Sequence, residues 1–434
     1  MSNSGMSSLA IYLLPFAAIM LFYFLSRSKK EAHSAKQLKE ATEAGLTEPS
    51  SLHPFIDPAK CLGAGSCAIA CPEGAIGLIK GRAHLINPTV CIGHGACMAS
   101  CPHGAITLVF GTEKRGMDIP YVKPNFETNV PGIFIAGELG GMGLIRKAAT
   151  QGSQAIEAIS KLKDGANPLD VVIVGAGPAG LAAGLAAMEK KLRHVILEQE
   201  ISLGGAIFQY PRSKVAMTAP VKLPIIGEVK MKEISKEELL AFWNGALKKT
   251  GMKINLNERM ETITRTDKGF TVKTTKQSYE TRTVLLAIGR RGTPRKLGVP
   301  GEDLPKVVYN LIDPEQYRNK HVLVVGGGDS ALEAAIAIAE QPGTTVAISY
   351  RSEAFGRGKP RNRERLQALE AKGRIKILLK SNVKLIERER VHLEQEGQAI
   401  ELPNNGMIVC AGGILPTPFL KEIGVMVETK FGTA

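Results

Sequence analysis

Residues 170–184, DVVIVGAGPAGLAAG, decide the fold of the larger part of this 434-residue chain. An apolar strand runs into a loop with three glycines, and an alanine-rich helix follows. In such a loop the first glycine makes a tight turn, the second lets a pyrophosphate approach, and the third lets helix and strand pack closely. The helix N-terminus then faces the phosphates. The residues expected to contact a dinucleotide here are Gly175, Gly177, Pro178, Ala179 and Gly180.

A second strand, residues 194–197, ends in Glu198, which lies 23 residues after Gly175. A carboxylate at this place accepts hydrogen bonds from a ribose diol. Strand, loop, helix, strand and acid in this order predict a parallel α/β unit for dinucleotide binding. Gly204 and Gly205 follow closely and are expected to make further contacts with the cofactor.

Residues 321–332, HVLVVGGGDSAL, form a second loop of the same kind. The strand after it, residues 345–350, ends in a tyrosine followed by Arg351 instead of an acid, and Arg357 comes shortly after. Loss of the carboxylate and gain of arginine favour a 2′-phosphate, hence NADP(H) over NAD(H). The expected contacts are Gly326, Gly328, Asp329, Ser330, Ala331, Arg351 and Arg357.

The basic residues that follow this strand could serve a purpose other than nucleotide binding. They could form a solvated basic face, or a surface on which an acidic redox partner docks. The residues concerned are Arg351, Arg357, Lys359, Arg361, Arg363 and Arg365.

Six of the seven cysteines lie between Cys61 and Cys101, inside a repeat with a period of 30 residues. FIDPAKCLGAGSCAIACPEGAIGLI starts at Phe55, and LINPTVCIGHGACMASCPHGAITLV starts at Leu85. Two copies of one small unit are expected to pack about a pseudo-twofold axis. A compact cysteine block in a long chain with nucleotide motifs indicates metal binding in a reducing compartment.

Each repeat has the pattern C-x5-C-x3-C-P and, over residues 55–110, resembles a two-cluster ferredoxin that has lost its second cysteine. Ala64 and His94 occupy the vacant positions. The resemblance implies that one cluster binds the first cysteine set, Cys61, Cys67 and Cys101. It implies that the other cluster binds the second cysteine set, Cys91, Cys97 and Cys71.

Three thiolates leave one iron corner without a protein ligand. Ala64 cannot bind iron, so a three-iron (3Fe-4S) cluster is expected at the first set. His94 either completes a four-iron (4Fe-4S) cluster or stands unbound beside a three-iron cluster. The alternative is that the six thiolates bind zinc, which favours sites with four ligands.

The two glycine loops, with the strand TVLLAIGRRGTP from Thr283 between them, resemble the two-dinucleotide flavoproteins of the thioredoxin reductase type. The resemblance implies FAD at the first loop and NAD(P)H at the second, with Gly289 beside the flavin. Family members close the flavin site with a late segment, which FETNVPGIFIAGELGG from Phe126 matches. Gly137 and Glu138 take the places of its Gly-Asp pair.

That segment precedes the first loop in this chain, whereas in the family it follows the nucleotide domain. We therefore predict a circularly permuted flavin domain joined by a linker at residues 161–168, with a domain-swapped homodimer as the alternative. The expected divisions are an anchor at 1–26, a linker at 27–54, an α+β ferredoxin-like module at 55–112, the displaced part of the FAD domain at 113–163, the remaining FAD-binding domain at 164–291, an NAD(P)-binding domain at 292–412, and a return segment at 413–434.

The N-terminus carries an apolar run at residues 9–25, followed by Arg27, Lys29 and Lys30. Seventeen apolar residues are near the lower limit for a membrane-spanning helix, and the charges that follow favour the cytoplasmic side. The expectation is a single-pass anchor in the inner (cytoplasmic) membrane, with the N-terminus outside and the catalytic part in the cytoplasm. A cleaved signal peptide is the alternative.

The net charge of +14 is compatible with a membrane surface or an acidic protein partner. Aromatic residues make up 5% of the chain, with a single Trp243, which argues against a nucleic-acid partner bound by base stacking. The segment before the second loop, residues 307–320, has no cysteine, so disulfide reduction by that route is excluded. Cys410 lies in an apolar strand and is expected to be a core residue.

These features predict an oxidoreductase that passes electrons between NAD(P)H, FAD and two iron–sulfur clusters, without a side-chain acid or base in the chemistry. The far partner would be a quinone enzyme, a cytochrome or an electron carrier. One alternative is a redox sensor or tether with little turnover. Another is a flavin reductase of a small molecule in which the clusters are structural.

Overall fold

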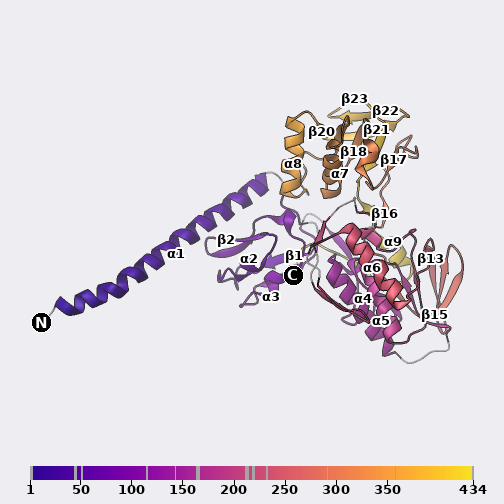
Figure 1. The fold of residues 1–434 in the computed structure, drawn as a ribbon, viewed down its shortest axis with the longest axis horizontal. Helices are drawn as coiled ribbons and strands as arrows, with labels where there is room; N and C mark the ends of the chain where they lie inside the picture. The colour runs from indigo at the N-terminus through magenta and orange to yellow at the C-terminus, as the bar shows by residue number, and fades with distance from the viewer. Residues whose placement is uncertain are drawn as a thin grey trace. The chain divides into compact units, whose positions relative to one another are not determined.

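The structure is a computed structural model that describes residues 3–43, 46–49, 52–113, 116–141, 143–162, 167–210, 215–217, 220–230, 233–290, 292–356 and 358–432. The chain divides into two compact units (Figure 1). Unit 1 comprises Met1–Val109 and Gly432–Ala434, and unit 2 comprises Phe110–Phe431.

Unit 1 begins with the helix α1 (Asn3–Glu43), which passes through residues 26 and 27 without a break. Among the described residues, no helix has an apolar stretch long enough to cross a membrane. The predicted anchor, and the inner-membrane location that depended on it, is therefore wrong. The physical reason is length, because 17 residues rise only about 26 Å along a helix and a bilayer core is about 30 Å thick.

The repeat in unit 1 folds into two small sheets with exchanged strands. In the first copy, β1 (His53–Ile56), α2 (Ser66–Ala70) and β2 (Ile76–Ile79) follow one another. The second copy consists, in order, of β3 (Arg82–Leu85), a short turn of helix (Pro88–Val90), α3 (Ala96–Ala99) and β4 (Ile106–Val109). Strand β1 pairs with β4, and β2 pairs with β3, both antiparallel. Each copy therefore completes a sheet with the other, which is the pairing that a pseudo-twofold arrangement requires.

The helix α1 packs on this module through its polar half. The Glu31 carboxylate accepts a hydrogen bond from the backbone N–H of Gly81, in the β2–β3 turn, at 3.2 Å. Ser34 is buried, and a Cβ at Gly77 of β2 would overlap its side chain. Residues 27–43, the first part of the predicted linker, therefore lie in a helix that packs on the module.

Unit 2 contains a six-stranded sheet in the order β13-β14-β15-β7-β8, with β6 beside the second half of β15. Strands β6, β15, β7 and β8 are parallel, and β13, β14 and β15 are antiparallel. The bounds are β6 (Ile133–Ile135), β7 (Leu169–Val174), β8 (His194–Leu197), β13 (Met260–Thr266), β14 (Gly269–Thr274) and β15 (Ser278–Leu286).

Successive side chains of β7 point to opposite faces of the sheet, and both faces are buried. Val171 and Ile173 face a core that includes α4 (Ile145–Ser160), α5 (Pro178–Glu189) and α6 (Lys236–Thr250). Val172 and Val174 face a second core with Leu420 of α9 (Thr417–Glu422). Side chains alternate between faces along a strand, so a continuous apolar run is what a doubly covered strand needs.

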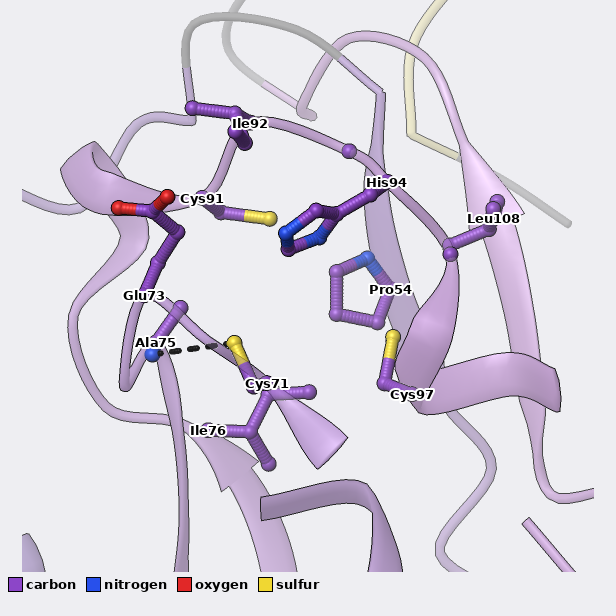
Figure 2. Close-up of a pocket in the computed structure, with 12 residues that line it drawn as sticks. Pro54, Cys71, Glu73, Ala75, Ile76, Cys91, Ile92, His94, Cys97 and Leu108 are labelled. Carbon is purple, nitrogen blue, oxygen red and sulfur yellow. Dashed lines mark hydrogen bonds between the residues drawn. The ribbon is translucent and has the colours of Figure 1, made fainter. Parts of the chain in front are cut away.

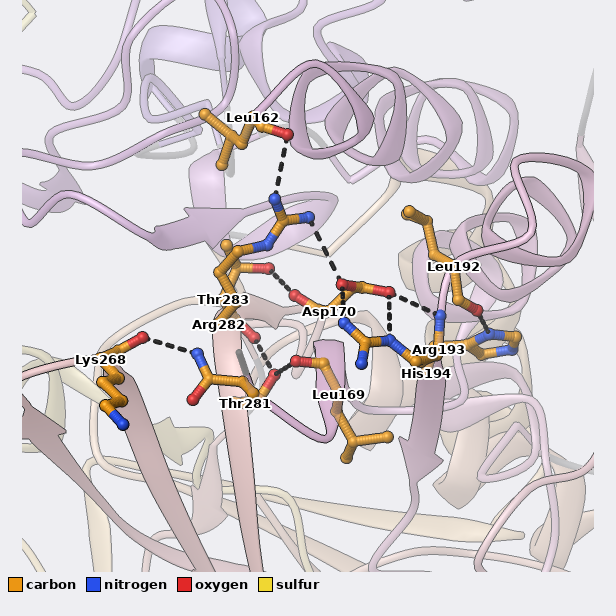
Figure 3. Close-up of polar contacts among 11 residues, drawn as sticks. Leu162, Leu169, Asp170, Leu192, Arg193, His194, Lys268, Thr281, Arg282 and Thr283 are labelled. Atoms are coloured by element: carbon orange, nitrogen blue, oxygen red, sulfur yellow. Dashed lines mark hydrogen bonds and ion pairs between the residues drawn. The ribbon is translucent and has the colours of Figure 1, made fainter. Parts of the chain in front are cut away.

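Asp170 anchors the start of β7 (Figure 3). Its buried carboxylate accepts hydrogen bonds from the Arg193 side chain at 2.8 and 3.1 Å and from the Arg193 N–H at 2.9 Å. The guanidinium of Arg282, on β15, lies 3.8 Å away and donates to the carbonyl of Leu162, just after α4. The hydrogen bonds from Arg193 lower the pKa of Asp170. A charged network thus ties together three strands at the amino end of the sheet.

A second sheet in unit 2 has five parallel strands in the order β17-β24-β18-β19-β20. Helices α7 (Asp329–Ala339) and α8 (Pro360–Ala371) contribute to the core on one face, and β22 contributes to the core on the other. The bounds of these five strands are β17 (Val307–Val308), β18 (His321–Val325), β19 (Thr345–Tyr350), β20 (Ile375–Leu379) and β24 (Gly406–Val409). A separate antiparallel sheet consists of β21 (Ser381–Ile386), β22 (Arg390–Gln395) and β23 (Gln398–Pro403).

Short elements complete unit 2. Two connecting segments pair through β16 (Thr293–Pro294) and β25 (Gly413–Ile414). The late strand β26 (Val427–Lys430) pairs with the early strand β5 (Met117–Pro120). Between residues 215 and 235, β9 (Val215–Met217) pairs with β12 (Glu233–Ser235), and β10 (Val221–Leu223) pairs with β11 (Gly227–Val229). Three-residue helical turns lie at Glu138–Gly140 and Gly205–Ile207, and a four-residue one lies at Pro314–Tyr317.

Candidate functional site: two nucleotide loops and a cysteine pocket

The carboxyl ends of four strands meet at one edge of the first sheet. Three backbone hydrogen bonds run along it, from Ala136 to Leu286 (3.1 Å), from Ala287 to Val174 (2.8 Å) and from Gly175 to Leu197 (2.7 Å). The predicted residues Gly137, Gly175, Glu198 and Gly289 all follow directly on these strand ends or lie within a few residues of them. In parallel sheets, ligands bind at this edge.

The three glycines of the first loop differ in what a side chain would meet. Gly175 has φ +105°, and a Cβ there would lie 2.5 Å from the carbonyl oxygen of Ala287. A Cβ at Gly180 would overlap the carbonyl oxygen of Gly175. At Gly177, the nearest atom is the Cα of Gly205, at 3.9 Å. The protein itself requires the outer two glycines, whereas the middle one keeps a stretch of backbone open, which fits a pyrophosphate.

Gly204 and Gly205 lie against this open stretch. The N–H of Gly204 donates to the carbonyl of Ala176 at 2.8 Å. A Cβ at Gly205, where φ is +54°, would come within 3.0 Å of the Cα of Gly177. Gly204 and Gly205 therefore form one wall together with Gly177, and this wall is lined by backbone atoms.

Glu198 is buried at the end of β8, beside the first loop. Its carboxylate accepts hydrogen bonds from the N–H of Ala176 at 2.8 Å and from the N–H of Glu200 at 3.0 Å. Burial raises the pKa of this carboxyl group. Each carboxylate oxygen has a second lone pair, so the group can bind the loop and still accept a ribose hydroxyl.

The early segment with Gly137 and Glu138 lies beside the first loop, although it precedes that loop by about 40 residues. Gly137 has φ +83°, and a Cβ there would lie 3.0 Å from the Cβ of Ala179, in the first turn of α5. The Gly137 N–H donates to the side chain of Gln151 at 2.9 Å. Sequence reasoning missed Gly152, where a Cβ would overlap the carbonyl oxygen of Ala179. The available signal was a glycine at a buried position of a helix.

The second loop repeats the pattern of the first. A Cβ at Gly326 would lie 2.5 Å from the carbonyl oxygen of Cys410, and one at Gly327 would overlap the ring of Tyr350. A Cβ at Gly328 would meet no atom of the described chain within 4 Å, so the backbone there is open like that of Gly177. Ala331 is buried in α7, and Ser330 is exposed.

Asp329, predicted to contact a cofactor, holds a neighbouring loop. Its carboxylate accepts hydrogen bonds from the N–H of Lys359 at 2.7 Å and the side chain of Asn362 at 3.0 Å. Arg351 is exposed directly after β19, and Arg357 lies outside the described residues. Arg363 is half-buried, and Arg365 is exposed and pairs with Glu340 at 2.6 Å.

The second cysteine set lines one pocket in unit 1 (Figure 2). Cys71, Cys91 and Cys97 share its wall with His94 and Glu73. The space between these side chains is partly open to solvent. In the described residues, no three His, Cys, Asp or Glu side chains converge on a single metal-ion position. Ligands of a cluster bind different iron atoms, so they surround a volume instead of converging on a point.

Backbone N–H groups point at the sulfurs of both sets. Ala75 donates to Cys71 Sγ at 3.4 Å, and its counterpart Ala105 donates to Cys101 Sγ at 3.3 Å. Ala83 donates to Cys61 Sγ at 3.4 Å. Such hydrogen bonds to sulfur tune a cluster's potential.

Burial raises the pKa of Cys67, of Cys97 and of Cys91, the last to about 11. A thiolate ligand must lose its proton when metal binds, so assembly of a cluster here releases protons. Buried thiols around a cavity, with N–H groups aimed at sulfur, fit an iron–sulfur group.

Two family models match the sequence. One, described as a pyridine nucleotide-disulphide oxidoreductase, covers residues 172–432. The other, described as a 4Fe-4S dicluster domain, covers residues 53–102.

Individual proteins agree with these matches. A bacilliredoxin reductase of Bacillus subtilis is 28% identical over 267 residues, which are 60% of this chain and 82% of that protein. A ferredoxin–NADP reductase of Pediococcus pentosaceus is 32% identical over 232 residues, 52% of this chain and 67% of that protein. The solved structure of a bacillithiol disulfide reductase from Staphylococcus aureus is 25% identical, has a TM-score of 0.52, and covers 59% of this chain and 80% of that one.

These matches confirm the predicted α/β fold of the thioredoxin reductase type and the predicted FAD, nicotinamide nucleotide and iron–sulfur cofactors. The chain thus belongs to the pyridine nucleotide-disulphide oxidoreductase family, as an FAD-dependent NAD(P)H oxidoreductase that also carries a 4Fe-4S dicluster domain.

Proposed function

We propose that the protein is a ferredoxin–NADP reductase with a built-in ferredoxin, which exchanges electrons between NADP(H) and a further electron-carrier protein. One observation carries the proposal: a dicluster domain precedes a nucleotide-dependent flavoprotein domain in the same chain, whose relatives include ferredoxin–NADP reductases. When bound, FAD accepts hydride and releases single electrons, which suits clusters that carry one electron at a time.

We assign FAD to the first loop and the nicotinamide nucleotide to the second. The open backbone at Gly177 and at Gly328 supports both assignments, because each leaves room for a phosphate at a helix N-terminus. Glu198 would hold the ribose of FAD, and Arg351 would bind the 2′-phosphate of NADP(H). The chain's own residues bind and orient, and no side chain is required to move a proton.

We also propose that the flavin domain is circularly permuted. The early strand β6 pairs with β15 in the same sheet as the first loop, and Gly137 lies against α5. The linker at residues 161–168 is short and polar, which supports permutation over a domain-swapped pair. Light scattering of the purified protein separates the two, because a swapped arrangement requires a dimer.

An anaerobic titration with NADPH and NADH tests the function. We expect NADPH to bleach the flavin absorbance and then to produce the electron paramagnetic resonance signal of reduced clusters. Bleaching without any cluster signal would favour a flavin reductase with structural clusters. Failure of both nucleotides to reduce the flavin would contradict the proposal and favour a redox sensor.

An acidic electron carrier is the acceptor class that the charge favours, since the chain has 55 Lys and Arg against 41 Asp and Glu. We expect reduction of an acidic ferredoxin or flavodoxin to slow as the salt concentration rises. A rate independent of salt would argue against electrostatic docking.

A further inference from the structure

The two cluster sites have the same backbone around the vacant second-cysteine position. Gly63 and Gly93, before that position, have φ of +70° and +74°. Gly65 and Gly95, after it, have φ of +77° and +76°, and each precedes a short helix. A side chain at residue 64 therefore leaves its loop in the same direction as one at residue 94.

Glycine is required at these turns, so the loops cannot relax into different shapes. A Cβ at Gly63 would overlap the carbonyl oxygen of Gly81, and one at Gly93 would overlap the carbonyl oxygen of Leu52. Gly81 lies in the turn between β2 and β3, and Leu52 lies just before β1. The loop conformation is set by packing, and only the side chain at the centre differs.

That side chain is an imidazole in one site and a methyl group in the other. His94 is half-buried and lines the pocket of the second cysteine set. In Figure 2 its ring points into the space bounded by Cys71, Cys91 and Cys97, whereas the Glu73 carboxylate points outward. Ala64 is exposed and has no donor atom. Imidazole nitrogen is an established iron ligand, and in some clusters it replaces thiolate.

We propose that the two clusters are chemically unequal. His94 is the fourth ligand of a four-iron cluster held by the second cysteine set. The first cysteine set, whose vacant position is occupied by Ala64, holds a three-iron cluster. The dicluster domain would then contain two different electron carriers, because the reduction potential depends on the cluster type and on the net charge of the cluster with its ligands. The proposal rests on the assignment of clusters to these cysteines and is independent of the electron acceptor.

Iron content and magnetic resonance of the full-length holoprotein test it. We expect about seven irons per chain, four plus three, and a three-iron signal in the oxidised protein. His94→Ala should lower the iron content to about six and double that signal, and His94→Cys should restore the wild-type values. Ala64→Cys should raise the content to about eight and abolish the signal.

Two matched controls separate ligation from proximity. His84 lies on β3 in the same module and is exposed, so His84→Ala should change neither iron content nor signal. Glu73→Gln removes the charge of a carboxylate in the pocket wall and should also leave both unchanged. In protein labelled with ¹⁵N-histidine, a nitrogen coupling to the reduced four-iron cluster should appear, persist in His84→Ala and vanish in His94→Cys.

Several results would overturn the proposal. Wild-type protein with eight irons and no three-iron signal would show that both sites are complete. Wild-type protein with six irons, or a His94→Ala variant identical to the wild type, would show that His94 is not a ligand. If His94→Ala fails to fold, two measurements still test the proposal. The nitrogen coupling in the wild type tests ligation by His94, and the gain of iron in Ala64→Cys tests the three-iron cluster at the first cysteine set. None of these measurements depends on NADPH oxidation, so the proposed function can fail or hold separately.

Discussion

The two glycine loops of unit 2 share a plan and differ at the third position of the motif. In the first loop, helix α5 comes so close to the strand that a Cβ at Gly180 would overlap the Gly175 carbonyl. In the second, the corresponding residue is Ala331, whose side chain is accommodated and fully buried. The middle glycine is open in both, at Gly177 and Gly328. The comparison separates glycines that the protein requires from those that a ligand requires.

The largest effect on stability is expected at Gly180, where neighbouring protein atoms leave no room for a side chain. Gly180→Ala should displace α5 from the loop, cost about 3 kcal/mol or more in the free energy of unfolding, and abolish FAD retention. The flavin-to-protein ratio and urea unfolding measure this. The reverse change in the second loop, Ala331→Gly, should cost only about 1 kcal/mol and leave FAD bound. A Gly180→Ala protein with full flavin content would refute the distinction.

The open glycines offer a pair of matched substitutions. Gly177→Ala and Gly328→Ala meet no close protein atom, so both proteins should unfold within about 1 kcal/mol of the wild type. Gly177→Ala should weaken FAD binding about 100-fold, because the methyl group would occupy the place of the pyrophosphate. Gly328→Ala should keep its FAD and raise the KM for NADPH by a similar factor. The same defect in both variants would mean that the loops do not bind different nucleotides.

The strands that lead into the loops begin differently as well. Strand β7 carries Asp170 as its second residue, within a charged network. Strand β18 instead starts at an exposed His321, whose backbone N–H donates to the Asn405 side chain and whose ring lies within hydrogen-bonding distance of the Thr345 hydroxyl. Asp170→Asn should cost about 2 kcal/mol in the free energy of unfolding, because the Arg193 and Arg282 guanidiniums lose their charged partner. His321→Ala should cost less than about 1 kcal/mol.

The effect of Asp170 should depend on pH in a defined direction. Its pKa is lowered in the folded protein by the hydrogen bonds from Arg193. The stabilisation is therefore present above about pH 4, where the unfolded carboxyl is ionised, and is lost as the pH falls through the folded pKa. Urea unfolding at a series of acidic pH values should show a smaller loss of stability in Asp170→Asn than in the wild type. Parallel curves would contradict this assignment.

Sequence patterns predicted the nucleotide-binding sheets because glycine spacing and apolar runs report local geometry directly. The three glycines from Gly175, and the apolar strands around them, leave few alternatives. The repeat likewise placed its cysteines in corresponding positions. Hydrophobicity alone misled at residues 9–25, because a short apolar run is compatible with several structures.

The features that could not be predicted from the sequence depend on contacts between residues far apart in the chain. Gly152 is needed only because α4 packs against the first turn of α5. The pairing of β5 with β26 joins residues about 310 apart, and no local pattern carries that information. The Asp329 carboxylate accepts hydrogen bonds from the Lys359 N–H and the Asn362 side chain, a role visible only once α7 and α8 are placed. Its predicted contact with a cofactor stays a prediction.

The smallest expected effect concerns the residue after each second strand. Glu198 is buried and fixed by two backbone N–H groups, whereas Arg351 is exposed. An exposed charge contributes at most about 1 kcal/mol, so Arg351→Glu should reduce the preference for NADPH over NADH only about fivefold. Steady-state kinetics with both nucleotides measure the ratio of kcat/KM, and the effect should shrink at high salt because the charge is screened. Arg351→Lys, which keeps the charge, is the control and should retain most of the preference. An unchanged ratio in Arg351→Glu would show that another residue of the second loop recognises the 2′-phosphate.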